Sequence, residues 1–397
     1  MKLFARLAPR LVRATEEVAV GWRASRRTGV AACGLALLAA CASGGAGTRA
    51  RGARGPEASQ RRSTFPRGNP AMDQGWTISG REQVDAWLHG FAMVMKDTTH
   101  VPIFARGYRQ NMEALERQKN VTSGLTANAD KLAARFAAEP TLINAQFVAM
   151  YFASFDDLAL GARQFLDAQG DARSTTNQDL QNRIAIFAEY FPTASDREWL
   201  QMFLPALQDD YTRFYHDYWT AEQSRRAPVV AEISRRWTST WYPVLRTYLS
   251  NTQQGSGEFL LSLPLAGEGR TTSESGITAS AVAFPETVGD VDDAFYSIVH
   301  ETVQQITNVA LGANGSLLRR QSDYDVWGAS AAVRGGEILL ARLDPGARAG
   351  YMSYYLRAAG EAVPAGDATA AFEKAFPLPK PILDEISRQL ESVLVTP

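Results

Sequence analysis

The spacing of apolar residues predicts helices along most of the chain from residue 79 to residue 251. Apolar side chains recur there at helical intervals, as in VDAWLHGFAMVM, residues 84–95. Ser79 with Glu82, and Ser195 with Glu198, have the spacing of capping boxes that begin helices. Pro and Gly residues interrupt the pattern between the expected helices. These helices span residues 79–96, 102–118, 128–138, 141–166, 177–190, 195–219 and 229–249.

The pattern changes after residue 251. Two short apolar runs bounded by Gly and Pro, EFLLSLPL (258–265) and ITASAVAF (277–284), predict strands joined by a polar loop. Further helices are expected at 290–311, 324–343, 347–359 and 380–394. The sequence therefore predicts a mostly α protein, with a large helical domain at 75–251 and a small α+β region at 252–397. A short β-hairpin or edge strands would form its β part.

The first 74 residues have the composition of a targeting segment followed by a tether. The apolar run GVAACGLALLAAC, residues 29–41, is too short to span a bilayer, and Arg-rich flanks precede it. These features are typical of a secretory signal. The ending LAAC at Cys41 resembles the bacterial lipobox, which implies a lipid on Cys41 and cleavage before it. Residues 1–40 are then a signal peptide, and residues 41–74, rich in Gly, Ser, Arg and Pro, follow as a disordered tether.

Charge is distributed unevenly along the chain. Residues 1–40 hold seven basic and two acidic side chains, and residues 42–70 hold six Arg and one Glu, a net charge of +5 in each case. From Ala71 onward, 28 basic side chains face 39 acidic ones, a net charge of −11. An acidic body is a poor partner for nucleic acid, whereas a basic tether suits an anionic membrane surface. We therefore expect a lipid-anchored protein of the cell envelope. Ala42, in place of Asp after Cys41, favours the outer membrane over the inner one.

The helix expected at 290–311 carries the most informative motif, YSIVHETVQQITN (296–308). Its apolar residues form one stripe, and His300, Gln304 and Asn308 lie on the opposite side. His300 and Gln304 are one turn apart, which places their Cβ atoms about 5–6 Å from each other. Two side chains at that spacing can hold one metal ion, and Glu301 lies beside them.

HETVQ resembles the HExxH helix of gluzincin-type zinc metallopeptidases. The resemblance covers about residues 255–345 and includes the order strand, strand, helix, loop, helix. It implies that His300 is the first zinc ligand, Glu301 the general base and Glu337 the third ligand. It also implies a zincin-like region in which an edge strand aligns the backbone of a peptide.

Two features near Glu337 bear on this hypothesis. Gly335 and Gly336 stand inside an otherwise good helix, where each costs about 1 kcal/mol relative to Ala, which indicates a close approach by a backbone or a ligand. Packing of two helices with Glu337 at the surface is the competing interpretation. Three tyrosines that follow this helix in the sequence are candidate oxyanion stabilisers: Tyr351, Tyr354 and Tyr355.

Gln304 stands where the resemblance places the second ligand, and this departure decides between the functional hypotheses. An amide oxygen is a weak, neutral donor, whereas zinc prefers imidazole and thiolate, so zinc binding is expected to be weak. The leading hypothesis is a pseudoenzyme that binds peptides or a protein partner. One alternative is an active zinc metallopeptidase with an atypical ligand set, completed from the remaining histidines. A second is a structural helical envelope protein, in which His300 and Glu301 are only the polar face of a helix.

Overall fold

The computed structural model describes residues 75–96, 100–274, 277–318 and 321–395. The predicted signal peptide, the tether and Cys41 lie outside these residues. Of the described residues, 75–318 and 323–395 belong to one compact unit, and the predicted domain boundary at 251/252 falls inside it. The fold is mostly α with a small α+β region, as the sequence predicts.

Most of the predicted helices are present, with shifted ends. The α-helices are α2 (Glu82–Val94), α3 (Tyr108–Gln118), α4 (Gly124–Ala138), α5 (Phe155–Asp167), α6 (Gln178–Tyr190), α7 (Ala194–Asp210), α8 (His216–Arg225), α9 (Ala227–Arg236), α10 (Tyr242–Asn251), α11 (Val291–Ala313), α12 (Gln321–Leu343), α13 (Pro345–Ala359), α14 (Thr369–Ala375) and α15 (Lys380–Val395). Shorter 3₁₀ segments are η2 (Pro140–Tyr151), η3 (Ala172–Ser174) and η6 (Val288–Asp290). Two π-helical turns, η4 (Tyr211–Tyr215) and η5 (Trp237–Trp241), join α7 to α8 and α9 to α10.

Neither predicted capping box forms. The N-cap of α2 is Arg81, without a side-chain cap, and the Ser79 hydroxyl instead donates to Glu258. The N-cap of α7 is Thr193, two residues before the expected Ser195, because Thr193 and Asp196 form the capping box there. At α2 the serine hydroxyl bonds to a distant residue, and at α7 a different residue caps the helix. Sequence spacing alone reveals neither outcome.

The strands form one four-stranded sheet in the order β1-β2-β4-β3. The strands are β1 (Trp76–Ser79), β2 (Gly257–Ser262), β3 (Arg270–Glu274) and β4 (Ile277–Ala283). The two strands predicted from sequence correspond to β2 and β4, and they run parallel, so they do not form a hairpin with each other. The predicted loop between them contains β3, which pairs antiparallel with β4 and stands at the edge of the sheet.

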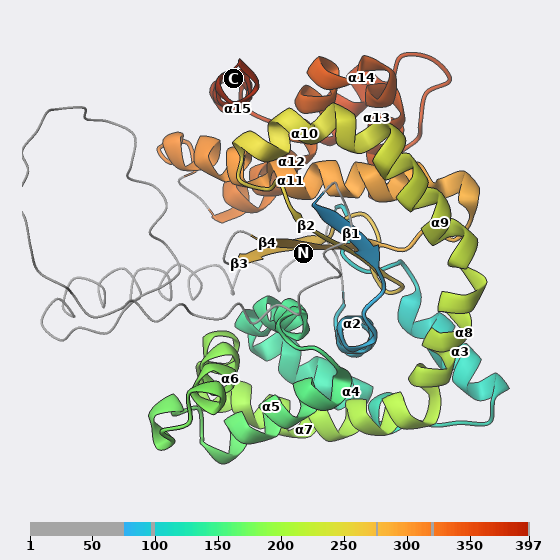
Figure 1. Ribbon diagram of the computed structural model, residues 1–397, viewed down its shortest axis with the longest axis vertical. Helices are drawn as coiled ribbons and strands as arrows, with labels where there is room; N and C mark the ends of the chain where they lie inside the picture. The colour runs from blue at the N-terminus through green and yellow to red at the C-terminus, as the bar shows by residue number, and fades with distance from the viewer. Residues whose placement is uncertain (1–74, 97–99, 275–276, 319–320, 396–397) are drawn as a thin grey trace, which may run out of the picture. The chain divides into compact units, whose positions relative to one another are not determined.

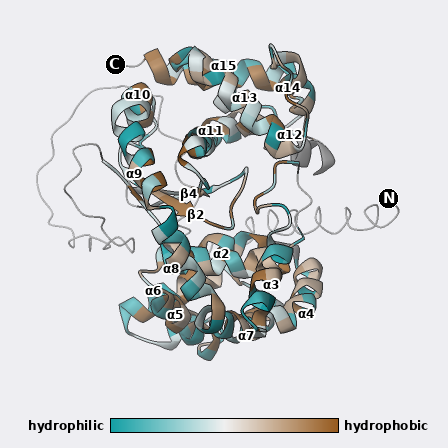
Figure 2. Ribbon diagram, turned by 90° about the vertical axis from the view of Figure 1, so that its right-hand side faces the viewer, coloured by the Kyte–Doolittle hydropathy of each residue, from teal (hydrophilic) through white to brown (hydrophobic). Residues whose placement is uncertain are grey.

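Both faces of the sheet are covered by helices (Figures 1 and 2). Along β2, Phe259 and Leu261 pack with α9–α15, whereas Leu260 packs with the helices from α2 to α7. This alternation explains why β2 reads as a nearly continuous apolar run, since buried strands need apolar residues on both sides. Helices α9 and α10, which precede residue 252, belong to the same core as α11.

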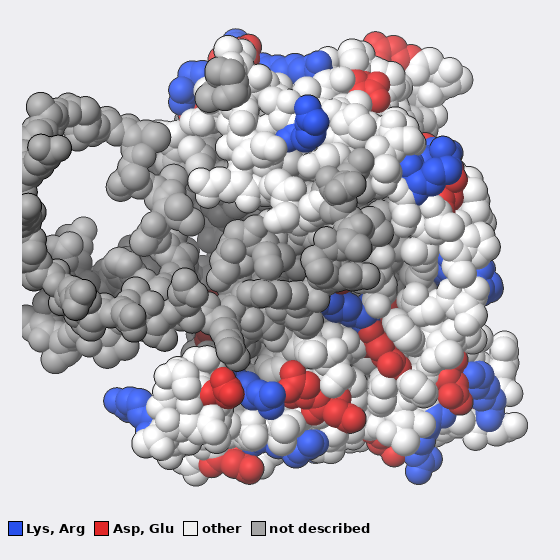
Figure 3. Space-filling view, viewed as in Figure 1, with Lys and Arg blue, Asp and Glu red and all other residues white. Residues whose placement is uncertain are grey.

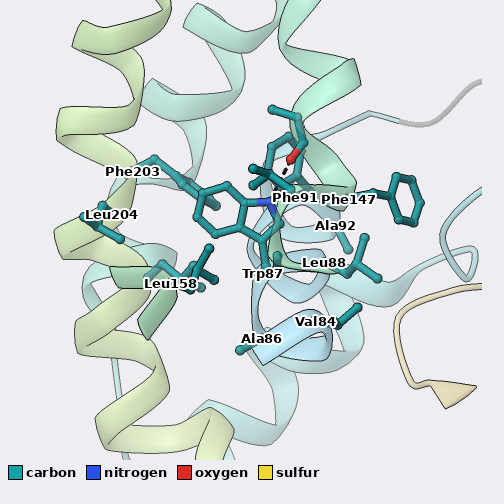
Figure 4. Packing of buried hydrophobic residues seen from close by; sticks show 14 of the residues in the cluster. Val84, Ala86, Trp87, Leu88, Phe91, Ala92, Phe147, Leu158, Phe203 and Leu204 are labelled. Atoms are coloured by element: carbon teal, nitrogen blue, oxygen red, sulfur yellow. Dashed lines mark hydrogen bonds between the residues drawn. The ribbon is translucent and has the colours of Figure 1, made fainter. Parts of the chain in front are cut away.

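The core on the α2 side is built around Trp87, which is fully buried. Its ring lies edge-on to Phe203, with centroids 5.3 Å apart, and its indole N–H donates to the carbonyl of Ala145 (Figure 4). Aromatic pairs of this kind add about 0.5–1.5 kcal/mol beyond the burial of their area. Among the residues that the structure describes, no helix is both long enough and apolar enough to span a membrane.

Candidate functional site

Helix α11 positions His300 and Glu301 under the edge of the sheet. The helix packs against β4, and both side chains are buried, each only 2% exposed, whereas Gln304 is half-buried and Asn308 is exposed. His300 and Glu301 therefore do not lie on a solvent-facing side of the helix. Buried polar groups are costly unless they are hydrogen-bonded, so their partners determine what the site can do.

The carboxylate of Glu301 accepts three hydrogen bonds from protein groups. The backbone N–H of Gly269 and the side-chain amide of Gln304 donate to Oε1, at 3.2 and 2.9 Å. The hydroxyl of Thr271 donates to Oε2 at 3.1 Å. Gly269 and Thr271 lie at the start of β3, so this carboxylate joins the edge strand to α11.

Burial dominates the electrostatics of both residues. Burial, opposed by Arg270 and by the hydrogen bonds and assisted by the nearby Glu268, raises the pKa of Glu301 to about 7. Burial together with the Arg270 cation lowers the pKa of His300 to about 3. His300 is therefore neutral at physiological pH, the form in which an imidazole could bind a metal or share a hydrogen bond.

The Nδ1 atom of His300 lacks the hydrogen bond that orients the ring of a metal-binding histidine. Nδ1 is buried and has no hydrogen-bond partner among the described residues, while Nε2 lies 3.8 Å from Glu301 Oε1. A ligating histidine almost always donates its other N–H to a carboxylate or a carbonyl, which fixes the ring. Here the ring is held by stacking on Tyr355, with centroids 5.4 Å apart.

The other expected ligands are engaged elsewhere. Gln304 points its amide at Glu301, and Glu337 pairs with the guanidinium of Arg348 at 2.6 Å and with Arg334 at 3.7 Å. Nowhere in the described ranges do three His, Cys, Asp or Glu side chains gather as a metal site. The donors that the resemblance assigns to zinc therefore do not fit the ion in this arrangement.

The remaining histidines also have partners of their own. His89 bonds to Tyr108 and Asp210, each at 3.0 Å, inside the core on the α2 side. His216 bonds to Glu82 at 2.5 Å, and the ring of His100 packs on Phe376. Within the described part of the chain, none of them joins His300 to form a metal site.

Packing explains the two glycines of α12. A Cβ on Gly336 would lie 2.1 Å from the Tyr351 hydroxyl, and one on Gly335 would lie 2.6 Å from the Thr307 side chain. The close approach that the sequence indicates is thus made by α13 and α11. It allows the Tyr351 hydroxyl to donate to the carbonyl of Val333 at 3.0 Å.

The three candidate oxyanion stabilisers are buried in the core between α11 and α13. The Tyr351 hydroxyl is bonded to Val333, and that of Tyr354 to Ser297 and to the carbonyl of Ala266. The hydroxyl of Tyr355 has no hydrogen-bond partner in the described residues. The ring of Tyr355 stacks on His300.

Two cavities flank the edge strand. The first, here the η2 cavity, has a volume of about 180 Å³ and lies between β3 and η2, lined mainly by Asn144, Phe147, Met150, Arg270 and Thr272. The second, the α11 cavity, has a volume of about 260 Å³ and lies between the start of β3, α11 and α12, lined mainly by Glu268, Arg270, His300, Gln304 and Asn308. Arg270 is common to both cavities.

Sequence reasoning missed the contribution of Gly269, Arg270 and Thr271. These residues lie in a polar stretch without the apolar alternation by which strands are detected. The available signal was the run RTTS, rich in β-branched residues between two glycines, which is compatible with a short edge strand.

Comparison of the chain with protein-family models, with curated proteins and with solved structures finds no match.

Proposed function

We propose that this chain is a lipid-anchored protein of the cell envelope whose zincin-like region is a pseudoenzyme that binds an extended peptide segment beside β3. The observation that carries the proposal is the set of hydrogen bonds around Glu301. In a zinc peptidase this carboxylate has to receive a proton from the metal-bound water. Here both oxygens accept bonds from Gly269, Thr271 and Gln304.

The sheet supports the peptide-binding part of the proposal. Strand β3 stands at the edge of the sheet order, opposite β1. Peptides commonly add to such an edge through main-chain hydrogen bonds, and pockets along it receive alternate side chains. The η2 and α11 cavities lie along this strand and supply such pockets.

The first test is the zinc content of the full chain, purified in detergent and measured by mass spectrometry before and after zinc loading. We expect well below one zinc per chain, because Gln304 and Glu337 are held by other side chains. Cleavage of fluorogenic peptides is measured beside it, with Glu301→Gln as the matched control. Wild type and Glu301→Gln should show the same background rate.

The outcomes separate the functional hypotheses. Stoichiometric zinc together with hydrolysis that Glu301→Gln abolishes would replace the pseudoenzyme with an active metallopeptidase. Zinc in a Gln304→His variant, but not in the natural protein, would support a peptidase site that has lapsed at one ligand. If no peptide is bound or cleaved, the structural alternative replaces the proposal.

A further inference from the structure

The guanidinium of Arg270 is placed to bind a ligand carboxylate. Its side chain is 37% exposed, and it lines both the η2 cavity and the α11 cavity at the start of the edge strand. Any extended chain that follows β3 from one cavity to the other passes this cation.

The hydrogen bonds of Arg270 leave part of the guanidinium available. Nη1 donates to the carbonyl of Gly269 at 3.0 Å and to Glu268 Oε2 at 3.4 Å. Nε and Nη2 have no hydrogen-bond partner among the described residues. Arginine often binds a carboxylate through two parallel N–H groups, a geometry that a point charge such as lysine does not reproduce.

The surroundings hold the guanidinium in place without neutralising it fully. Its Cζ atom lies 5.5 Å from the centroid of the Phe147 ring, which packs against one side of the cation. The ion pair with Glu268 is long and partly exposed, so it contributes little and is easily replaced by a better-placed carboxylate. On the α11 side, His300 is neutral, and the Glu301 carboxylate, whose pKa Arg270 lowers, accepts its hydrogen bonds from Gly269, Thr271 and Gln304.

We propose that the peptide bound beside β3 carries a carboxylate that Arg270 receives between the two cavities. The inference rests on the proposed peptide binding and specifies its partner class. The carboxylate comes either from an Asp or Glu side chain or from the C-terminus of the peptide. The surrounding cavities accept apolar groups near Phe147 and Met150 and polar groups near Gln304 and Asn308.

The test is an array of random dodecapeptides synthesised in three matched sets. One set has internal Asp or Glu and an amidated C-terminus, one has a free C-terminus without acidic residues, and one has neither. The full chain in detergent is applied to the array, and affinities of the best binders are measured by fluorescence anisotropy. We expect binders from one carboxylate-bearing set, and that set identifies the source of the carboxylate.

Variants then test Arg270 itself. Arg270→Gln should weaken the selected peptide at least about tenfold, the loss expected when a charge-assisted hydrogen bond is removed. Arg270→Lys should recover only part of it, since it keeps the charge but not the paired N–H groups. Arg173→Gln, which removes an exposed arginine on η3, should change nothing. Unchanged melting temperatures would show that the variants are folded.

Two results would overturn the inference in distinguishable ways. If selected peptides bind wild type and Arg270→Gln equally, the carboxylate subsite is wrong and the proposed peptide binding stands. If no set binds the wild-type protein, the proposed function fails and the subsite with it.

Discussion

The Glu301 carboxylate is held by three hydrogen-bond donors, Gly269, Thr271 and Gln304. Gln304, one turn further along α11, donates its side-chain amide to one oxygen of this carboxylate. Each hydrogen bond to a charged group is worth about 1.5–3 kcal/mol, provided that the group stays ionised. Burial favours the protonated form of Glu301, the hydrogen bonds favour the ionised form, and the resulting pKa is about 7. Both forms are therefore populated near neutral pH.

Asp85 offers a prediction at the same scale. It is buried at the junction of α2, β2 and α8, where it accepts hydrogen bonds from the Ser262 hydroxyl, the Leu263 N–H and the Trp219 indole. Burial raises its pKa to about 7, from an ordinary value of 3.8. The folded protein therefore holds this proton more tightly than the unfolded chain does. The stabilisation is complete below pH 4 and is lost as the pH rises towards 7.

We therefore expect the stability advantage of wild type over Asp85→Asn to fall by about 2–4 kcal/mol between pH 4 and pH 8. An asparagine would also place its amide against a donor, which costs about 1–3 kcal/mol at every pH. Urea unfolding at several pH values measures both effects. Asp217→Asn, an exposed change on α8, serves as the control and should show no such trend. A stability difference that does not change with pH would contradict the assignment.

At the scale of elements, the close pairing of β3 with β4 requires a glycine at position 269. A Cβ at this position would lie 2.2 Å from the carbonyl oxygen of Ala281 and 3.2 Å from Cγ of Glu301. Gly269→Ala should therefore push the start of β3 away from its neighbour and weaken the bond from the Gly269 N–H to Glu301. We expect a loss of about 1–3 kcal/mol of stability, as in other overpacked sites.

Chemical denaturation measures this loss, and hydrogen exchange should show reduced protection of the β3 amides. Gly366→Ala is the matched control, because no atom lies within 4 Å of a Cβ added there. Equal unfolding midpoints for the Gly269 and Gly366 variants would show that the edge strand tolerates displacement.

The elements that sequence predicts well are those with a strong period. The helix at Val291–Ala313 and the strand at Ile277–Ala283 were both expected within about two residues, because apolar spacing specifies them directly. Strand β1 was missed because WTIS forms a strand only by pairing with Gly257–Ser262, far along the chain. Such long-range pairing leaves no local period to detect.

The candidate site was predicted only in part, for a similar reason. The one-turn spacing of His300 and Gln304 follows from helix geometry, and both residues line the α11 cavity. Arg348, the nearer of the two partners of Glu337, could not be predicted, because it reaches Glu337 from the following helix. Arg270 was missed because nothing in a polar loop sequence indicates that two cavities meet there.

At the scale of the whole molecule, charge and covalent anchoring give separate predictions about the N-terminus. Acidic and basic side chains lie side by side over the lower helices in Figure 3. The sequence from Ala71 onward is nevertheless acidic in sum, while residues 42–70 carry a net charge of +5. Next to an anionic leaflet, the basic stretch is attracted and the acidic body is repelled. The lipid proposed at Cys41 would hold this arrangement at the membrane surface.

Metabolic labelling with a palmitate analogue tests the anchor. Cys41→Ala should abolish the label and leave an uncleaved, larger precursor, because attachment and cleavage both need the thiol. Cys33→Ala is a closely matched control: it removes the other cysteine of the chain, upstream of the proposed cleavage, and should keep the label.

A single acyl chain binds membranes only marginally, whereas several chains anchor stably, so wild type should partition fully into the detergent phase. Label on Cys41→Ala, or its loss from Cys33→Ala, would refute lipidation at Cys41, and density-gradient fractionation would place labelled wild type in the outer or the inner membrane.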